Sequence, residues 1–577
     1  MVKRLVSGDF PIWYDIGEYE AGLNSALTEL QEIKAARRIW NRDGTLWQSA
    51  PEAVAEIQDR LGWLDLPDSM LVDVPRLQAL ALEMRAAGMT HVVLLGMGGS
   101  SLAPEVMQHI LGVLPGYLEL TILDSTDPSQ IAHLSNRIPL SQTLFLVSSK
   151  SGTTSETAAL FDYFSEAIRE KVDPREWARY FIAITDPETK LADMAQKSRF
   201  RNLYLNPPDI GGRYSALSLF GLVPAALIGQ NLDNLLQSAR AMAWECRAAR
   251  PVQENGALVL GAIMGELARH PTHPRDKLTL LTSAPLAPFT PWLEQLIAES
   301  TGKEGVGIVP VEAESPEADF YGSDRLFAYL RLGMADNKAN DNLISQLVDR
   351  RHPVVVLQIR ELHHLGAEFF RWEFATAVAG QRLGINPFDQ PNVESAKKRT
   401  KEALAAYAEQ HALPMLDPVL TTDPLSFYGP QYATNDAASY LDAFLNQANP
   451  GDYVALLAFL ERNEVNDALL REMSRTIGQA MHVAVTIGFG PRFLHSTGQL
   501  HKGGPNTGLF IQITQEDSEE LPIPGHDYSF SVLKQAQALG DWQALQDANR
   551  RVIRVNIGPD VQAGLQKLAD ALQSALT

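Results

Sequence analysis

Short runs of apolar residues alternate along this chain with longer stretches in which apolar residues recur every three or four positions. The short runs predict buried strands and the longer stretches predict helices, and this alternation is typical of parallel sheets covered by helices. The first set of predicted strands is 91–95, 118–123, 143–147 and 180–184, with 203–205 as a fifth candidate. We assign them to one doubly wound α/β domain over residues 55–250.

The same rhythm continues through the rest of the chain. Residues 251–412 predict a second α/β domain, with helices at 255–270 and 291–300, strands at 278–282, 306–311 and 354–359, and two long helices at its end. A turn-rich stretch at 413–418 opens a C-terminal α/β extension, 413–577, with strands predicted at 453–459, 482–487, 508–513 and 552–557. Residues 1–54 predict an N-terminal helical segment, with an amphipathic helix over 18–40.

Composition narrows the class of protein. The chain has 577 residues, 45% of them hydrophobic, so it can bury several cores, and its net charge of −20 argues against a nucleic-acid or anionic-membrane partner. Its one cysteine, Cys246, excludes an internal disulfide and a cysteine-based zinc site, and suits the cytoplasm. The longest apolar stretch, 217–229, is interrupted by Pro224 and is too short to cross a membrane, and the N-terminus lacks the apolar core of a signal peptide.

The first candidate for chemistry is the hydroxyl-rich segment 148–157, between a predicted strand and a predicted helix. Its polar side chains are Ser149, Lys150, Ser151, Thr153 and Thr154. A helix start offers unpaired N–H groups and partial positive charge, which suits a phosphate, whereas a simple helix cap needs only one such side chain. The segment therefore predicts a binding site for a phosphorylated small molecule.

A second turn follows the first predicted strand, at 96–101. Gly99 lets the backbone approach a ligand, and Ser100 adds a hydroxyl at the start of a helix. The turn is close to a dinucleotide fingerprint, with Asp124 at the end of the next strand as the ribose-binding acid, so a nucleotide-dependent oxidoreductase is one alternative. Ser101 stands where the final glycine belongs, however, and two phosphate-seeking turns on one sheet edge favour a sugar phosphate.

Three charged residues are candidates for catalysis. Arg213 follows the fifth candidate strand, Glu299 ends an apolar helix with Gln295 one turn before it, and Lys397 lies in a basic run. A proton transfer between adjacent carbons needs one carboxylate and no redox cofactor or metal, and a guanidinium can stabilise the enediolate. Spacing alone is equally consistent with an ion pair, a solvated glutamate and a solvated helix face.

At this point the motifs resemble those of glucose-6-phosphate isomerases. The matching segments are Gly-Met-Gly-Gly-Ser at 96–100, Ser-Lys-Ser-Gly-Thr-Thr-Ser-Glu-Thr at 149–157, Gly-Gly-Arg-Tyr-Ser at 211–215, Gln295 with Glu-Ser-Thr-Gly-Lys at 299–303, and Asn-Pro-Phe-Asp-Gln-Pro-Asn-Val-Glu-Ser-Ala-Lys at 386–397. They occur in the family's order over roughly residues 90–400, so the resemblance is specific.

The resemblance implies a glycolytic and gluconeogenic enzyme that interconverts glucose 6-phosphate and fructose 6-phosphate without cofactor or metal. Its fold would be two sugar-isomerase (SIS) domains, with active sites built across a homodimer. It assigns the phosphate and substrate to Gly99, Ser100, Ser149, Lys150, Ser151, Thr153, Thr154, Gln295 and Gln390. Glu299 would carry the proton between C2 and C1, Arg213 would stabilise the cis-enediol intermediate, and Lys397 would take part in ring opening.

The chain departs from the family in two places. Family members carry a histidine about twenty residues after the base, which acts in ring opening from the neighbouring subunit, but residues 319–327 contain none. Spontaneous opening, Lys397, Tyr321, Asp324 or a histidine from elsewhere, such as His501 in the turn 495–505, are the open alternatives. The chain also continues for about 170 residues past the lysine motif; that tail resembles the isomerase part of transaldolase/glucose-6-phosphate isomerase fusions, with no transaldolase portion.

Two further functional alternatives stay open at the level of sequence. The same chemistry with a broader substrate range would include mannose 6-phosphate. A sugar-phosphate-binding regulator that has lost catalysis would need only the phosphate turns, so intact Glu299, Arg213 and Lys397 argue against it.

Overall fold

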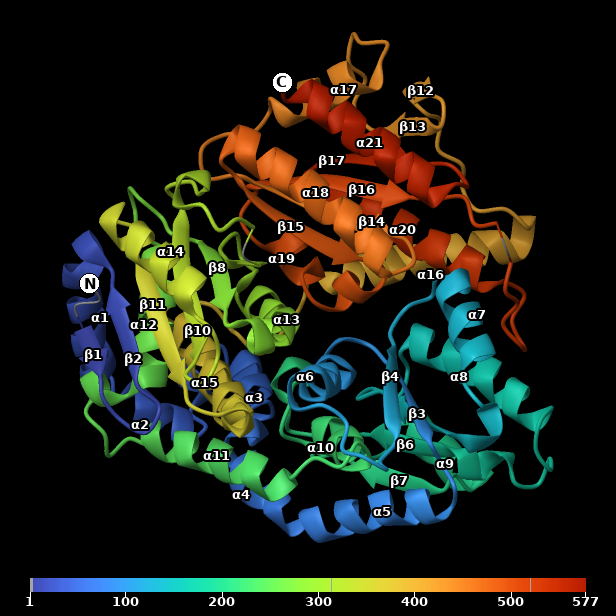
Figure 1. Ribbon diagram of the computed structural model, residues 1–577, viewed down its shortest axis with the longest axis horizontal. Helices are drawn as coiled ribbons and strands as arrows, with labels where there is room; N and C mark the ends of the chain where they lie inside the picture. Colours follow the sequence, from blue (N-terminus) through green and yellow to red (C-terminus); the bar gives the residue numbers. More distant parts are fainter. Residues whose placement is uncertain (1–3, 313, 519) are drawn as a thin grey trace.

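The computed structural model describes residues 4–312, 314–518 and 520–577. Its strands form three sheets, each flanked by helices, and the sheets occupy three lobes of the molecule (Figure 1). Most neighbouring strands are parallel. The expected α/β class with mostly parallel sheets is confirmed.

The first sheet has the strand order β4-β3-β5-β6-β7 and is parallel throughout. Its strands are β3 (His91–Gly96), β4 (Glu119–Leu123), β5 (Thr143–Ser148), β6 (Phe181–Thr185) and β7 (Asn202–Leu205). They begin and end within one residue of the sequence predictions, because strands buried on both faces are continuous apolar runs. The helices of this part of the chain are α3 (Pro51–Gln58), α4 (Leu66–Ser69), α5 (Val74–Ala86), α6 (Leu102–Leu111), α7 (Pro128–Arg137), α8 (Ser155–Arg169), α9 (Lys190–Ser198), α10 (Leu219–Leu227) and α11 (Leu232–Glu245).

The second sheet has the order β1-β2-β11-β10-β8-β9. Strands β8 (Lys277–Thr282), β9 (Val309–Glu312), β10 (Arg325–Leu332) and β11 (Val354–Ile359) are parallel, whereas β1 (Arg4–Val6) and β2 (Ile12–Asp15) add an antiparallel edge. The N-terminal segment is therefore not only helical: its helices α1 (Glu20–Glu32) and α2 (Ala35–Trp40) follow two strands that the sequence pattern did not predict. The remaining helices are α12 (Gly256–Ala268), α13 (Thr290–Thr301), α14 (Lys338–Asp349), α15 (Leu365–Leu383) and α16 (Val393–Gln410).

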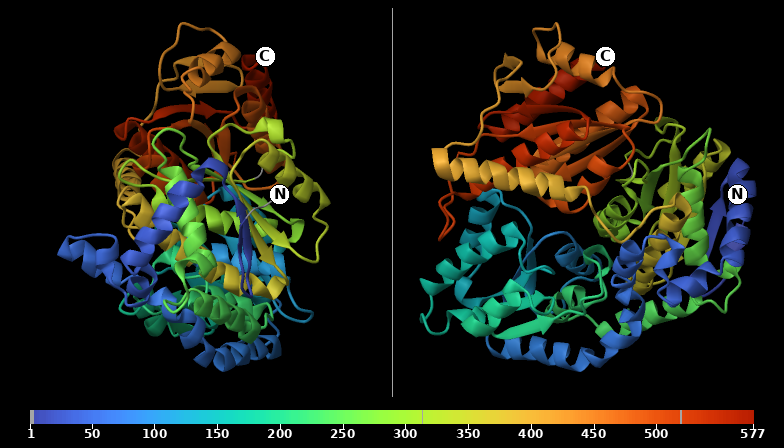
Figure 2. Two further views of the ribbon diagram at one scale, coloured as in Figure 1. Left: turned by 90° about the vertical axis from the view of Figure 1, so that its left-hand side faces the viewer. Right: turned by 180° about the vertical axis from the view of Figure 1, so that it is seen from behind.

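The C-terminal sheet has the order β12-β13-β17-β16-β14-β15. Its parallel strands are β14 (Tyr453–Phe459), β15 (Ala484–Phe489), β16 (Gly508–Thr514) and β17 (Arg551–Asn556), and β12 (Leu420–Thr422) and β13 (Leu425–Tyr428) form an antiparallel edge. Its helices are α17 (Ala437–Leu445), α18 (Glu464–Met481), α19 (Gly498–Gly503), α20 (Phe530–Asp547) and α21 (Val561–Ala575). Helix α16 runs along the base of this lobe and packs on α20 (Figure 2).

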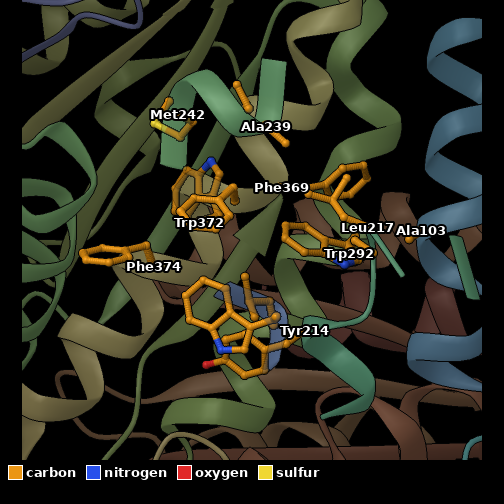
Figure 3. Close-up of a cluster of buried hydrophobic side chains, with 14 of the residues drawn as sticks. Ala103, Tyr214, Leu217, Ala239, Met242, Trp292, Phe369, Trp372 and Phe374 are labelled. Atoms are coloured by element: carbon orange, nitrogen blue, oxygen red, sulfur yellow. The ribbon is translucent and has the colours of Figure 1, made fainter. Parts of the chain in front are cut away.

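One continuous hydrophobic cluster joins the first two sheets, whereas the C-terminal sheet has a cluster of its own. At the centre of the joint cluster, α15 packs on α11 and α12, and Trp372 and Phe369 of α15 lie beside Trp292 of α13 (Figure 3). The ring centroids of Trp292 and Phe369 are 4.7 Å apart in an edge-to-face arrangement. This packing fixes α13, which carries Glu299, against the first sheet. In the part of the chain that the structure describes, no helix is long and apolar enough to span a bilayer.

Candidate active site

Two turns meet at the carboxyl edge of the first sheet. The 3-10 turn η5 (Gly98–Ser100) follows β3, and the turn 149–154 follows the neighbouring strand β5 and leads into α8. The Ser148 hydroxyl donates to the carbonyl of Ser100 at 3.1 Å, which ties the two turns together. The two predicted phosphate-seeking segments therefore share one edge of one sheet, where ligands of doubly wound folds bind.

The turn 149–154 is compact and ends at a helix N-terminus. Thr154 is the N-cap residue of α8, and its hydroxyl lies 3.0 Å from the hydroxyl of Ser149. Gly152 has a φ of +63°, and a β-carbon there would lie 2.7 Å from the Cβ of Thr189. Only glycine fits this position without strain. Because α8 has 15 residues, its first turn presents unpaired N–H groups of a full helix.

Lys150 in this turn is held by a partner that the sequence did not suggest. Its ammonium binds the carboxylate of Asp186 and donates to the carbonyl of Pro208 at 2.9 Å. Burial raises the pKa of Asp186, although Lys150 opposes this shift. An anion that binds at the turn would compete with Asp186 for the same ammonium group.

Glu299 lies at the C-terminal end of α13 with Gln295 one turn before it. The Gln295 amide donates to the Glu299 carboxylate at 3.2 Å, and a guanidinium nitrogen of Arg213 lies 3.4 Å from the other carboxylate oxygen. The Glu299 side chain is 14% exposed and that of Arg213 only 2%. The structure thus brings together Arg213 and Glu299, two of the three charged residues for which spacing alone was also consistent with a purely structural role.

Arg213, in the turn η8 (Gly212–Tyr214), is fixed by four hydrogen bonds to two other segments. It donates to the hydroxyl of Ser300 at 2.7 Å, to the carbonyls of Pro387 and Asp389 at 2.8 and 2.9 Å, and to the amide oxygen of Gln390 at 3.0 Å. These bonds satisfy the buried guanidinium and leave it little freedom. The segment that carries Gln390 is thereby joined to the segment that carries Glu299.

Lys303, the last residue of the motif 299–303, is a further buried cation beside Arg213. Its ammonium binds the carboxylate of Asp389 at 2.7 Å. Burial, and then the positive charge of Arg213, lower the pKa of Lys303 to about 8. The Lys303–Asp389 pair is a second link, besides Arg213, that holds the segment before Gln390.

Two glycines let the turn after β3 approach both other segments. A β-carbon at Gly99 would lie 2.0 Å from the carbonyl oxygen of Gly212, and one at Gly98 would lie 2.7 Å from the side-chain nitrogen of Gln295. The backbone of η5 therefore bridges the phosphate turn and the Glu299 region. The candidate residues Gly99, Ser100, Ser149, Lys150, Ser151, Thr153 and Thr154 lie on the first sheet's edge, while Gln295, Glu299, Arg213 and Gln390 adjoin it.

Asp124 is unavailable as a ribose-binding acid. It is buried, and its carboxylate binds the guanidinium of Arg492 at 2.8 Å and accepts a hydrogen bond from Ser101 at 3.3 Å. Ser101 occupies the place of the fingerprint's last glycine. These contacts remove the basis of the dinucleotide alternative.

Lys397 does not join this group. Its ammonium binds Glu394 on the same helix at 2.7 Å, and its side chain is 52% exposed. Among the described residues, no hydrogen bond or ion pair links Lys397 to Glu299, Arg213 or Gln390.

The other candidates for ring opening are buried away from Glu299. Tyr321 donates to the carbonyl of Ser315, and Asp324 lies beside the ammonium of Lys277. The segment that carries His501 is not a turn: it forms the buried helix α19, and the His501 ring packs near Phe510 with a centroid separation of 5.0 Å. Burial lowers the pKa of His501 well below its ordinary value.

The sequence analysis missed His495 and Glu156, which lie between the phosphate turn and Gln295. The His495 Nε2 is 2.9 Å from a carboxylate oxygen of Glu156, and the His495 carbonyl accepts a hydrogen bond from Gln295 at 2.7 Å. Glu156 was visible as part of the motif 149–157, but nothing in the order of residues connects it with a histidine 339 positions away. Within the described ranges, no cluster of three or more His, Cys, Asp or Glu side chains is arranged to hold a metal ion.

Comparison with known proteins finds similarity to one family over part of the chain. A family model described as phosphoglucose isomerase matches residues 83–320. The glucose-6-phosphate isomerase of Campylobacter jejuni is 29% identical over 357 residues, which cover 54% of this chain and 85% of that protein. That of Rubrobacter xylanophilus is 29% identical over 432 residues, covering 66% and 95%.

Two solved structures share the fold. A glucose-6-phosphate isomerase from Chlamydia trachomatis superposes with a TM-score of 0.57 at 21% identity, covering 70% of this chain and 90% of that one. A hypothetical protein from Thermus thermophilus gives a TM-score of 0.58 at 24% identity, covering 68% and 100%. With the motifs gathered at one sheet edge and relatives matched over most of their length, the chain is similar to the phosphoglucose isomerases.

Proposed function

We propose that the protein interconverts glucose 6-phosphate and fructose 6-phosphate through an enediol. The observation that carries this proposal is the pairing of Glu299 with the buried Arg213 at 3.4 Å, beside the glycine turn that leads to the phosphate site. One carboxylate and one fixed cation are the groups that a proton transfer between adjacent carbons requires. The named relatives support the same substrates.

The geometry supports a division of labour between the two ends of the site. Ser149, Lys150 and the start of α8 would hold the phosphate, so that C1 and C2 of the opened sugar fall beside Glu299. Glu299 would take the proton from C2 and return it to C1, while a proton moves from the 2-hydroxyl to O1. Arg213 would stabilise the negative charge that develops on the enediolate oxygens. Gln295 and Gln390 would orient the hydroxyl groups.

The same proposal extends to assembly and organisation. A homodimer in the cytoplasm is the state that the family resemblance suggests, and the single cysteine, buried Cys246, is consistent with a reducing compartment. The three sheets support a division into 55–250, 251–412 and 413–577, with residues 1–54 preceding them.

A coupled assay from fructose 6-phosphate to glucose 6-phosphate tests this function. Glu299→Gln keeps the shape of the side chain but cannot carry a proton, and we expect its kcat to fall by about 10³-fold. Glu304→Gln, the same change at an exposed residue of the following turn, should keep the wild-type rate. An inactive wild type would refute the isomerase function, and an active Glu299→Gln would refute the assigned base.

A further inference from the structure

The family's histidine is missing from residues 319–324, and the structure shows what this segment does instead. It is covered by the C-terminal part of the same chain: a β-carbon at Gly322 would lie 2.5 Å from the carbonyl oxygen of His482, and one at Gly478 would lie 2.4 Å from the ring of Phe320. The His482 imidazole lies 3.2 Å from the carbonyl of Phe320. This segment is therefore occupied within its own chain and presents no imidazole to another subunit.

His495 lies at the opposite end of the same C-terminal unit and faces the candidate active site. It ends the 3-10 turn η13 (Arg492–His495), which follows β15. Gln295, the residue that also binds Glu299, donates to the His495 carbonyl at 2.7 Å. A β-carbon at Gly98 would lie 3.1 Å from the Cβ of His495. His495 thus lies next to the glycine turn 98–100, and a single residue, Gln295, connects it with Glu299.

The His495 imidazole contacts a carboxylate of α8, the helix that follows strand β5 of the first sheet. Its Nε2 lies 2.9 Å from Glu156, which is in the first turn of α8, two residues after Thr154. Gln537 donates to the same carboxylate oxygen at 2.8 Å, and Ser155 to the other at 2.9 Å. Burial works against ionisation of Glu156, but the positive charge of His495 and its hydrogen bond lower the pKa of this carboxyl to about 2.

This arrangement suits proton transfer. One ring nitrogen is oriented by an ionised carboxylate whose side chain is only 5% exposed, while the His495 side chain is 23% exposed, so part of the ring is accessible. Histidine is the side chain that most often transfers protons in enzyme active sites. Its place between the phosphate turn and Gln295 is where the sugar ring would lie if the phosphate and C2 occupy the positions proposed above.

We propose that His495, oriented by Glu156, opens and closes the sugar ring, and that the C-terminal unit thereby completes the active site of its own chain. The step rests on the proposed isomerase function. In opening, the protonated imidazole gives its proton to the ring oxygen O5 as the C1–O5 bond breaks. The 1-hydroxyl loses its proton to water, the C1–O1 bond becomes a carbonyl, and the imidazole regains a proton from water. Ring closure in fructose 6-phosphate reverses the transfer at O5.

A substrate that cannot form a ring separates this step from isomerisation. 5-Deoxyfructose 6-phosphate lacks the hydroxyl that closes the ring, so it needs only Glu299, and its turnover can be followed by NMR at C1 and C2. His495→Gln keeps a donor toward Glu156 but cannot transfer a proton. We expect kcat/KM for fructose 6-phosphate to fall by about 100-fold while the value for the open-chain analogue changes less than about 3-fold.

His526 supplies the matched control. It also belongs to the C-terminal unit and pairs with a carboxylate of α8, Asp162, at 3.0 Å, so His526→Gln makes the same change at the same type of contact and should leave both substrates unaffected. If His495→Gln lowered kcat/KM equally for both substrates, His495 would have only a structural role. If it lowered neither value, the proposal would be refuted. Failure of the isomerase function itself would show differently, because the wild-type protein would then turn over neither fructose 6-phosphate nor the open-chain analogue.

Mixing two inactive variants tests whether the imidazole acts within its own chain. If His495 served a neighbouring subunit, co-refolding Glu299→Gln with His495→Gln chains would create sites with both native residues. We expect no recovery of activity on fructose 6-phosphate above the sum of the separate variants. Recovery toward a quarter or more of the wild-type rate would overturn the assignment to the same chain.

Discussion

The carboxyl edge of the first sheet and that of the C-terminal sheet face each other, but they present different groups. The first sheet ends in glycine and hydroxyl turns, at 98–100 and 149–154, that leave backbone N–H groups available. The C-terminal sheet contributes cations to the same interface: Arg492 after β15 binds Asp124 at 2.8 Å, and Lys534 of α20 binds Asp127 at 2.8 Å.

The difference shows that topology creates a place for a ligand at the edge of a sheet but does not determine whether a ligand binds there. Parallel strands followed by helices collect their loops at one edge in both sheets. Whether a ligand enters is decided by the side chains: short residues and a free helix start in one case, long charged residues with buried partners in the other. We infer that the edge of the first sheet binds substrate and that the edge of the C-terminal sheet holds the two sheets together. His495 belongs to the C-terminal edge but lies at the proposed substrate site.

Among these variants, Lys534→Met at the edge of the C-terminal sheet should have the largest effect, and the effect should be on stability. The ammonium is 2% exposed and bridges the buried carboxylates of Asp127 and Asp517. Removing one member of a buried charge cluster leaves uncompensated charge, so the free energy of unfolding should fall by about 3–5 kcal/mol. Urea unfolding followed by tryptophan fluorescence measures this.

The control for that variant is an exposed pair between α16 and α20. Arg399 of α16 binds Asp547 of α20 with side chains 39% and 48% exposed, and Arg399→Met should leave the urea midpoint nearly unchanged. Equal losses for the two variants would mean that the buried cluster does not fasten the edges.

Lys150→Met should have an intermediate effect, and on substrate binding rather than on folding. The ammonium lies in the phosphate turn, so its loss should lower kcat/KM by about 10–100-fold, mainly through KM, since charge-assisted bonds to phosphate are among the stronger ones. Steady-state kinetics at fixed ionic strength measure this. Lys171→Met, at the far end of α8, should change KM little. If Lys534→Met raised KM as much as Lys150→Met does, the two sheet edges would not differ in their role.

The smallest effect is expected from pH. Burial, and then the like charge of Glu312, raise the pKa of Glu294 to about 8, against the opposing charge of Arg492. The native state therefore holds a proton that the unfolded chain has lost above pH 4.5, and the free energy of unfolding falls as pH rises from there toward 8. Glu294 accepts a hydrogen bond from Ser496 at 3.4 Å, which favours the charged form and so opposes the rise in pKa.

Between pH 6 and 7, one such proton lowers stability by about 1.4 kcal/mol. Glu294→Gln should remove this part of the slope, as measured by urea midpoints at the two pH values. An unchanged slope in the variant would place the titration on another group.

The fold was largely predictable where strands are buried and weakly predictable at sheet edges. Parallel strands such as β3 and β14 are long apolar runs, so the pattern gave their limits almost to the residue. The edge strands β1, β2, β12 and β13 are three or four residues long, too short for a periodic pattern. Strand β10 was missed as well; it begins with Arg325, a charge that is buried here because Glu314 pairs with it at 2.7 Å.

The candidate site divides in a similar way. Residues within a motif, such as Ser149 to Thr154, come together because they are neighbours in the chain. Glu299, Arg213 and Gln390 were linked by resemblance; they lie on three separate segments, and Arg213 contacts both of the others. Asp186 and His495 had no sequence signature, and Lys303 was visible only as the end of the motif 299–303, because each acquires its role from a partner distant in the chain.

The sequence by itself therefore predicted the class of fold and the two turns at the edge of the first sheet, and it indicated the resemblance to one family, because these depend on local periodicity and on residues spaced along one segment. Only the tertiary structure decided the rest: that Asp124 is neutralised by Arg492, that Lys397 lies exposed on α16, and that His495 rather than His501 faces the site. The physical reason is that burial and charge pairing are properties of the packed interface between sheets, and that interface joins residues hundreds of positions apart.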